Sequence, residues 1–141
     1  MEQIADKRAA LYSPRQVFWA AFFGGPLALT YLLARNFNGL GRDADARRYL
    51  LVGFLLSLAI LVVLIMLPGK ASVGLFIGCA FAGQHMARDL HFGGAKLPAE
   101  GTPIHSAWRT TASTVLAFIV WLVLVIVAIM VLDATGYKIP D

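Results

Sequence analysis

Three histidines, His85, His91 and His105, are the residues best suited to chemistry, and all of them lie between the end of the third long apolar run, which includes His85, and the start of the fourth. His85 and Asp89 are four residues apart, so on a helix their side chains would share one face. Imidazole and carboxylate groups are the ligands that zinc and related divalent metals use. Together with Gln84, these residues form a candidate polar or metal-binding site, although their spacing matches no recognised metal motif.

The alternative is a structural role for the same side chains. Histidines near a membrane interface commonly serve as anchors or as hydrogen-bond partners between helices. Gln84 and His85 lie within one helical turn of Arg88, where lipid headgroups and water would reach them. A polar pair marks a transport pathway only if it lies deep in the bilayer. Glu100, in the following loop, would offer a metal one further carboxylate.

Motifs for catalysis are missing from the sequence. It contains no nucleophile elbow, phosphate-binding loop, paired carboxylates or haem-attachment motif. The glycine pairs Gly24-Gly25 and Gly93-Gly94 lack the strand-and-helix context that a nucleotide site requires. We therefore expect no enzyme activity and no cofactor.

The elements that would position these residues follow from the distribution of apolar residues. Hydrophobic residues make up 59% of the chain and charged residues 14%, with a mean hydropathy of +0.72, which is unlike a soluble domain. The uncharged intervals approach or exceed the roughly 20 residues that a helix needs to cross a bilayer. The sequence predicts an all-α polytopic membrane protein, a four-transmembrane-helix bundle in one domain over residues 1–141. The predicted spans are residues 16–34, 49–67, 71–87 and 110–132, with a loop at 88–109.

The charge of the chain indicates the same environment. A net charge of +4 and a pI near 9.6 could suggest nucleic acid, but the basic residues stand singly or in pairs at the ends of apolar runs. Cations in those places bind anionic headgroups. The expected partner is the lipid bilayer, and no nucleic acid. We expect no cleavable signal peptide, and the single cysteine, Cys79, can form no intrachain disulfide.

The first apolar run has a marked start and an interruption. Ser13, Pro14 and Gln16 have the spacing of a helix cap with a capping box. Gly24-Gly25-Pro26 then predicts a kink, because proline has no amide hydrogen to donate to the preceding turn. A broken helix can supply backbone groups to a transport site. Glycine and proline are also common in membrane helices that only pack.

This N-terminal stretch also resembles a known group of proteins. Its features are Tyr12-Ser13-Pro14, the run FGGPLA from Phe23 to Ala28, and Asn36. They are similar to the start of a family of small uncharacterised bacterial integral-membrane proteins. The resemblance implies a multi-pass protein of the bacterial inner (cytoplasmic) membrane and implies no mechanism.

We predict that residues 71–87 form the central packing helix, because small residues recur in this segment every four positions. In lipid, such rows let two helix backbones approach closely. The first row is Gly74, Gly78 and Ala82, and beside it lie Cys79, Gly83 and Ala87. We expect close helix packing here, either within the chain or with a second protein.

Four spans would place both termini on one side of the membrane. That side would carry Lys7, Arg8, Arg15, Lys70 and Lys138, and the other side Arg35, Arg42, Arg47, Arg48, Arg88, Lys96 and Arg109. The positive-inside rule then favours, by a narrow margin, cytoplasmic loops and external termini.

The function most in keeping with these features is helix–helix recognition, as in accessory, regulatory or immunity-type membrane proteins. The partner would be another membrane protein or further copies of the chain. The alternative is a small homo-oligomeric channel or transporter, lined by the broken first helix or by Gln84 and His85. A third hypothesis is a metal-dependent membrane enzyme.

Overall fold

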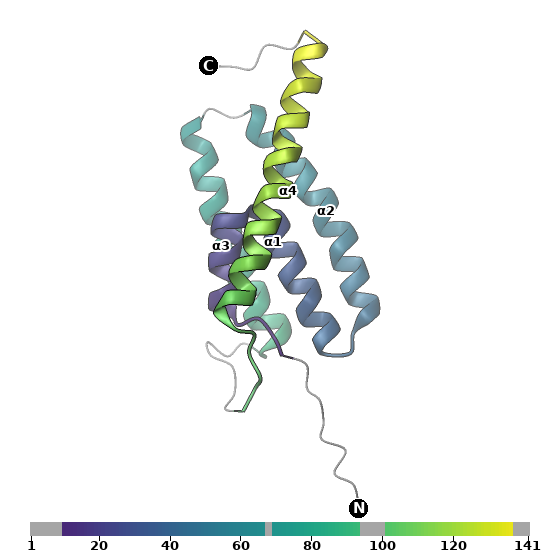
Figure 1. Ribbon diagram of the computed structural model, residues 1–141, viewed down its shortest axis with the longest axis vertical. Coiled ribbons are helices and arrows are strands. Elements are labelled where there is room, and N and C mark those ends of the chain that lie inside the picture. Colours follow the sequence, from purple (N-terminus) through teal and green to yellow (C-terminus); the bar gives the residue numbers. More distant parts are fainter. Residues whose placement is uncertain (1–9, 67–68, 94–100, 137–141) are drawn as a thin grey trace, which may run out of the picture.

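Four helices form the chain in the computed structural model, which describes residues 10–66, 69–93 and 101–136. They are α1 (Pro14–Gly39), α2 (Asp43–Met66), α3 (Gly69–His91) and α4 (Ala107–Ala134). Within the described ranges, the one strand-like pairing is an isolated bridge between Leu11 and Ile104. The predicted all-helical class is therefore confirmed (Figure 1). Glu100, like the rest of residues 94–100 in the predicted loop, lies outside the described residues.

Polar caps determine where two of the helices begin. The hydroxyl of Ser13 accepts from the amide of Gln16, and the side chain of Gln16 accepts from the amide of Ser13, so the predicted capping box is confirmed. Ser106 caps α4 in a similar way through the amide of Arg109. Because of this cap, α4 starts before Thr110, where the apolar run had been expected to begin the helix.

The helix α1 reverses direction within its length. At Gly25 the backbone has φ 70° and ψ −167°, outside the helical region, and Pro26 follows. The beginning and end of α1 lie side by side, because Tyr12 N donates to Asn36 Oδ1 at 2.6 Å and Asn36 Nδ2 donates to Tyr12 O at 2.9 Å. A straight helix would hold these two residues far apart. The chain therefore enters and returns at one end of the bundle (Figure 1).

We call this element the re-entrant hairpin, with half-helices at residues 14–24 and 26–39. At 1.5 Å per residue the halves are about 16 and 21 Å long, against roughly 30 Å for the hydrocarbon core of a bilayer. The sequence predicted a kinked span over residues 16–34, whereas the structure folds those residues back. The physical reason is Gly25, because glycine tolerates a positive φ that other residues disfavour.

By length and composition, α1, α2 and α4 are each apolar enough to cross a membrane. The chain is therefore a membrane-embedded protein. The helix α3 lies outside that group, since glycines and polar residues such as Gln84 and His85 lower its hydropathy. Because α1 is folded at Gly25, the arrangement differs from the predicted bundle of four full spans.

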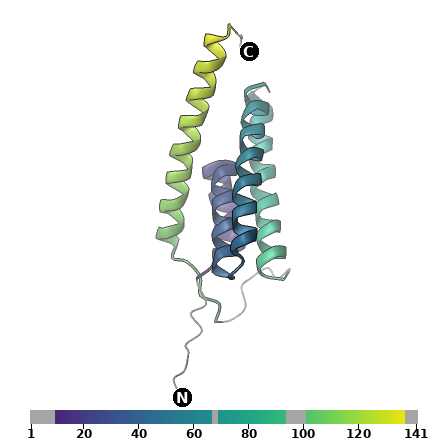
Figure 2. The ribbon, with the colours of Figure 1, turned by 90° about the vertical axis from the view of Figure 1, so that its right-hand side faces the viewer.

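The re-entrant hairpin is the centre of the fold, a place that the sequence had suggested for residues 71–87. Each of α2, α3 and α4 packs against α1, and the other helix pairs make only sparse contacts. Figure 2 shows α4 on one side of α1, with α2 and α3 on the other. The buried core accordingly consists largely of α1 residues such as Val17, Ala20, Leu32 and Leu33.

Small residues allow these close contacts. A Cβ atom at Gly53 of α2 would collide with Thr30 of α1, and one at Gly83 of α3 would collide with Leu29. On the other side, a Cβ at Gly24 would lie 3.1 Å from the carbonyl oxygen of Thr114 in α4. The three surrounding helices thus reach the hairpin at positions where no side chain intervenes.

The bundle has two ends, which we call the hairpin end and the far end. The hairpin end holds the start and the end of α1, the start of α2, the end of α3 and the start of α4. The far end holds the end of α2, the start of α3 and the end of α4 (Figure 1). The described chain therefore begins at the hairpin end and finishes at the far end.

Candidate functional site at the hairpin end and on helix α3

The polar groups that close the re-entrant hairpin lie at its open end. Asn36 is fully buried, and its side-chain amide forms both hydrogen bonds with the backbone of Tyr12, which is also buried. A side-chain amide offers both a donor and an acceptor, so it can pair with a backbone N–H and C=O at once. From the sequence, Asn36 was one of the residues that carry the family resemblance, and its position as a polar residue at the end of an apolar run was a further signal.

The segment before α1 is also joined to the segment before α4. Leu11 N donates to Pro103 O, and His105 N donates to Leu11 O, each at 2.9 Å. Gln16 Nε2 donates to the backbone oxygen of His105 at 2.7 Å. The ring of His105 lies 4.3 Å from that of Tyr12, centroid to centroid. His105 is therefore a bridging residue between the hairpin and α4.

His91, which lies beyond the apolar run 71–87, packs against the other side of the hairpin. Its ring is 4.5 Å from the ring of Phe37, and the guanidinium of Arg42 lies 4.7 Å from that same Phe37 ring. Neither ring nitrogen has a hydrogen-bond partner among the described residues. Burial, and secondarily the charge of Arg42, lower the pKa of His91 from 6.5 to about 4. The imidazole is thus neutral at pH 7.

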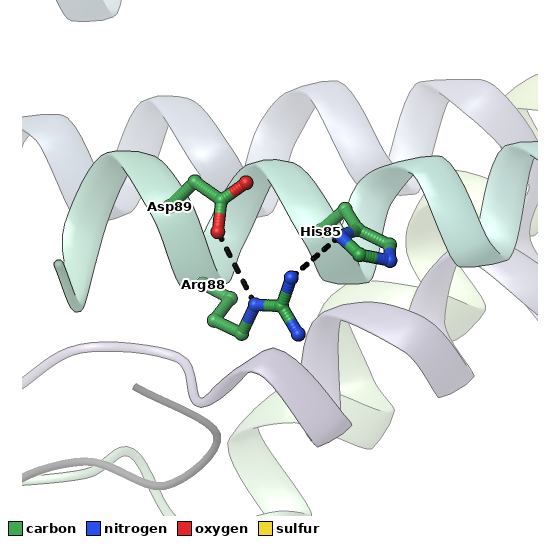
Figure 3. A network of polar contacts seen from close by, with 3 residues as sticks. All are labelled: His85, Arg88 and Asp89. Atoms are coloured by element: carbon green, nitrogen blue, oxygen red, sulfur yellow. Dashed lines mark hydrogen bonds and ion pairs between the residues drawn. The ribbon is translucent and has the colours of Figure 1, made fainter. Parts of the chain in front are cut away.

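His85 belongs to a separate, exposed group (Figure 3). Arg88 Nη2 donates to His85 Nδ1 at 2.7 Å, and Arg88 Nε donates to Asp89 Oδ1 at 3.2 Å. Arg88 therefore stands between the imidazole and the carboxylate that the sequence had placed together on one face. Gln84, the neighbour of His85, is half-buried.

The three histidines consequently have three different surroundings: Arg88, Phe37 and Tyr12, respectively. In the part of the chain that the structure describes, no three histidine, cysteine, aspartate or glutamate side chains are grouped closely enough to hold a metal ion. The burial of His105 and then the charges of Arg109 and Arg35 lower its pKa too. The positive charges of these two arginines would also repel a metal cation at His105.

The tip of the hairpin, Gly24-Gly25-Pro26, is enclosed by apolar and aromatic side chains. A Cβ on Gly25 would lie 3.2 Å from Phe76 Cε1 of α3 and 3.7 Å from Trp121 Nε1 of α4. Trp121 is itself buried. Irregular backbone at membrane depth needs cover from protein or from a water-filled cavity. Here the protein supplies that cover from both sides.

The two small-residue rows of α3 face different surroundings. Gly83 and Ala87 are buried against α1, where Gly83 meets Leu29. Gly74 and Gly78 have nothing within 4 Å of an added Cβ, and with Ala82 they are exposed. The structure therefore gives one row a partner inside the chain and turns the other row outward.

No protein-family model, curated protein or solved structure that was compared with this chain matches it.

Proposed function

We propose that this protein acts by helix–helix recognition in a membrane, through an outward face of α3 that we call the glycine face: Gly74, Gly78 and Ala82. No catalytic chemistry is part of this proposal. The observation that supports it is the open space beside Gly74 and Gly78. Such a face lets a second helix approach closely enough for its backbone to be in van der Waals contact.

The other helical glycines differ from Gly74 and Gly78 in their surroundings. Gly24, Gly53 and Gly83 each lie where α1 meets a neighbouring helix. A glycine within a helix costs about 1 kcal/mol relative to alanine. For Gly74 and Gly78 no contact inside the described chain offsets that cost, and contact with a second protein would. Val73, Ile77 and Phe81, which border the face, are exposed apolar residues that could surround such a contact.

The test is the association of purified protein in liposomes, measured by energy transfer between donor-labelled and acceptor-labelled copies. The variant Gly74→Leu with Gly78→Leu should abolish the transfer that the wild type shows. The control is Val127→Leu with Val131→Leu, at exposed positions of α4, which adds apolar bulk away from the glycine face and should leave transfer intact. If wild-type copies do not associate, pull-down from solubilised native membranes should recover a partner that the double leucine variant loses. Equal association, or equal capture of a partner, by the wild type and the double leucine variant would refute the proposal.

We also propose, from the resemblance of the segment around Tyr12, Pro26 and Asn36, that this membrane is the bacterial inner membrane. Fractionation of cells that express a tagged chain would test this. Recovery in outer-membrane or soluble fractions would contradict it.

A second candidate function, a homo-oligomeric channel or transporter, is favoured by the reversal at Gly25. Half-helices that end inside the membrane supply backbone groups to substrate sites in transporters. Ion flux into liposomes that contain the protein would support this function. Flux that is lost together with association in the double leucine variant would support the homo-oligomeric channel, whereas lost association with unchanged flux would count against it.

A further inference from the structure

A groove runs between the first half of α1 and the start of α4. It encloses a cavity of about 820 Å³, within the size range of small-molecule sites. Both helices begin at the hairpin end, at Pro14 and Ala107. The groove therefore starts where lipid headgroups would lie and extends along both helices toward the tip of the hairpin.

The lining of this groove changes from polar to apolar along its length. Near the helix starts it contains Arg15, Thr110 and Thr111, and farther along it contains Trp19, Phe23 and Phe118. Arg15, Trp19 and Phe23 follow at intervals of four, so one face of α1 presents the whole gradient. From Arg15 to Phe23 the rise is about 12 Å, which is most of one leaflet of hydrocarbon.

The polar part of the groove is cationic. Arg15 is the one charged residue among those that line it, and no carboxylate lines it within the described chain. The ion pairs seen in the described residues are Arg42–Asp45 and Arg88–Asp89, so neither involves Arg15. The positive ends of two helix dipoles, at the starts of α1 and α4, point to the same region.

We infer that this groove binds an anionic phospholipid, with its phosphate near Arg15 and one acyl chain along Trp19, Phe23 and Phe118. Charge complementarity at one end and exposed aromatic walls at the other fit an amphiphile that lies parallel to the helices.

Quenching of Trp19 fluorescence by brominated lipid tests this inference. The protein would carry Trp108→Phe, because Trp108 is highly exposed, whereas Trp121 is buried. It would be reconstituted in phosphatidylcholine vesicles with a small fraction of brominated phosphatidylglycerol or, in parallel, brominated phosphatidylcholine. We expect stronger quenching by the anionic lipid.

The substitution Arg15→Gln should reduce that preference about fivefold, the effect of one interfacial cation on anionic lipid. The matched control is Arg48→Gln, since Arg48 is an exposed arginine at the same end of the bundle but in α2. It should keep the preference. Equal quenching by both lipids in the wild type, or an unchanged preference in Arg15→Gln, would overturn the inference. So would protection of Trp19 from both lipids by a second protein chain.

Discussion

Asn36 is the side chain that closes the re-entrant hairpin, and its replacement should be costly. The variant Asn36→Leu would leave the N–H and C=O of Tyr12 unpaired in a buried place. Each such group costs about 1–3 kcal/mol, so for the two groups we predict a loss of about 2–6 kcal/mol in the free energy of unfolding. Thermal unfolding in detergent would measure it. Asn38→Leu, at an exposed position of the same helix, is the control and should unfold like the wild type.

His91 should make stability depend on pH. Its pKa is about 4 in the folded protein against 6.5 for an unperturbed histidine, so between these values the unfolded state binds more protons. The contribution of neutral His91 to stability is then fully present above pH 6.5 and is lost as the pH falls toward 4. We predict that His91→Phe, which keeps an aromatic ring beside Phe37, removes this part of the decline. Unfolding curves of both proteins from pH 4 to 7 would show it, and parallel curves would contradict it.

Gly25 determines the shape of α1, and its backbone should not accept a side chain. With φ 70° and ψ −167° it lies in a region that is essentially limited to glycine, where other residues cost about 1–3 kcal/mol. A Cβ would also press on Phe76. We predict that Gly25→Ala lowers the unfolding temperature by several degrees.

The control is Gly41→Ala. Gly41 has a similar φ of 71°, but nothing lies within 4 Å of an added Cβ. It should destabilise less, because it adds strain without the contact with Phe76. If the two variants unfold alike, the enclosure of the hairpin tip contributes little.

Sequence patterns located the helices well and the reversal poorly. Apolar runs and the cap at Ser13 identified all four helices, because burial in lipid and capping are local properties of the chain. Gly24-Gly25-Pro26 indicated an interruption, but a kink and a full reversal share that signature. The distinction depends on the pairing of Tyr12 with Asn36, a tertiary contact that no local pattern encodes.

For the candidate site, too, the sequence predicted which residues matter but not which tertiary contacts they make. The spacing of Gly74, Gly78 and Gly83 predicted close packing, but only the positions of Leu29 and α1 show which glycines are already in contact. The positions of His85, His91 and His105 in the sequence grouped them as one candidate site. Their separate neighbours depend on side-chain packing that spacing does not determine.

For the molecule as a whole, the hairpin changes the expected topology. If α2, α3 and α4 each cross the bilayer and α1 returns to its own side, the described chain begins and ends on opposite sides. The hairpin end then carries seven of the eight described cations: Arg15, Arg35, Arg42, Arg47, Arg48, Arg88 and Arg109. The far end carries Lys70. By the positive-inside rule the hairpin end should face the cytoplasm, a far stronger bias than four straight spans would give.

Cysteine labelling in intact cells tests this topology. In a Cys79→Ala background, a cysteine at Thr135 should react with a membrane-impermeant maleimide in spheroplasts. A cysteine at Ala10 should react only after permeabilisation. Labelling of both positions from the same side would contradict this topology, because the number of crossings would then be even: either α1 crosses the membrane or α3 does not.

The closing contacts of the hairpin have a consequence for biosynthesis. Tyr12 and Asn36 are 24 residues apart, whereas Gln16 and its partner His105 are 89 residues apart. At roughly 5–20 residues per second, the ribosome completes Asn36 several seconds before His105 emerges. The hydrogen bonds between Asn36 and Tyr12 can therefore form before α4 is synthesised. They would stabilise the nascent hairpin and oppose the translocation of its tip across the membrane.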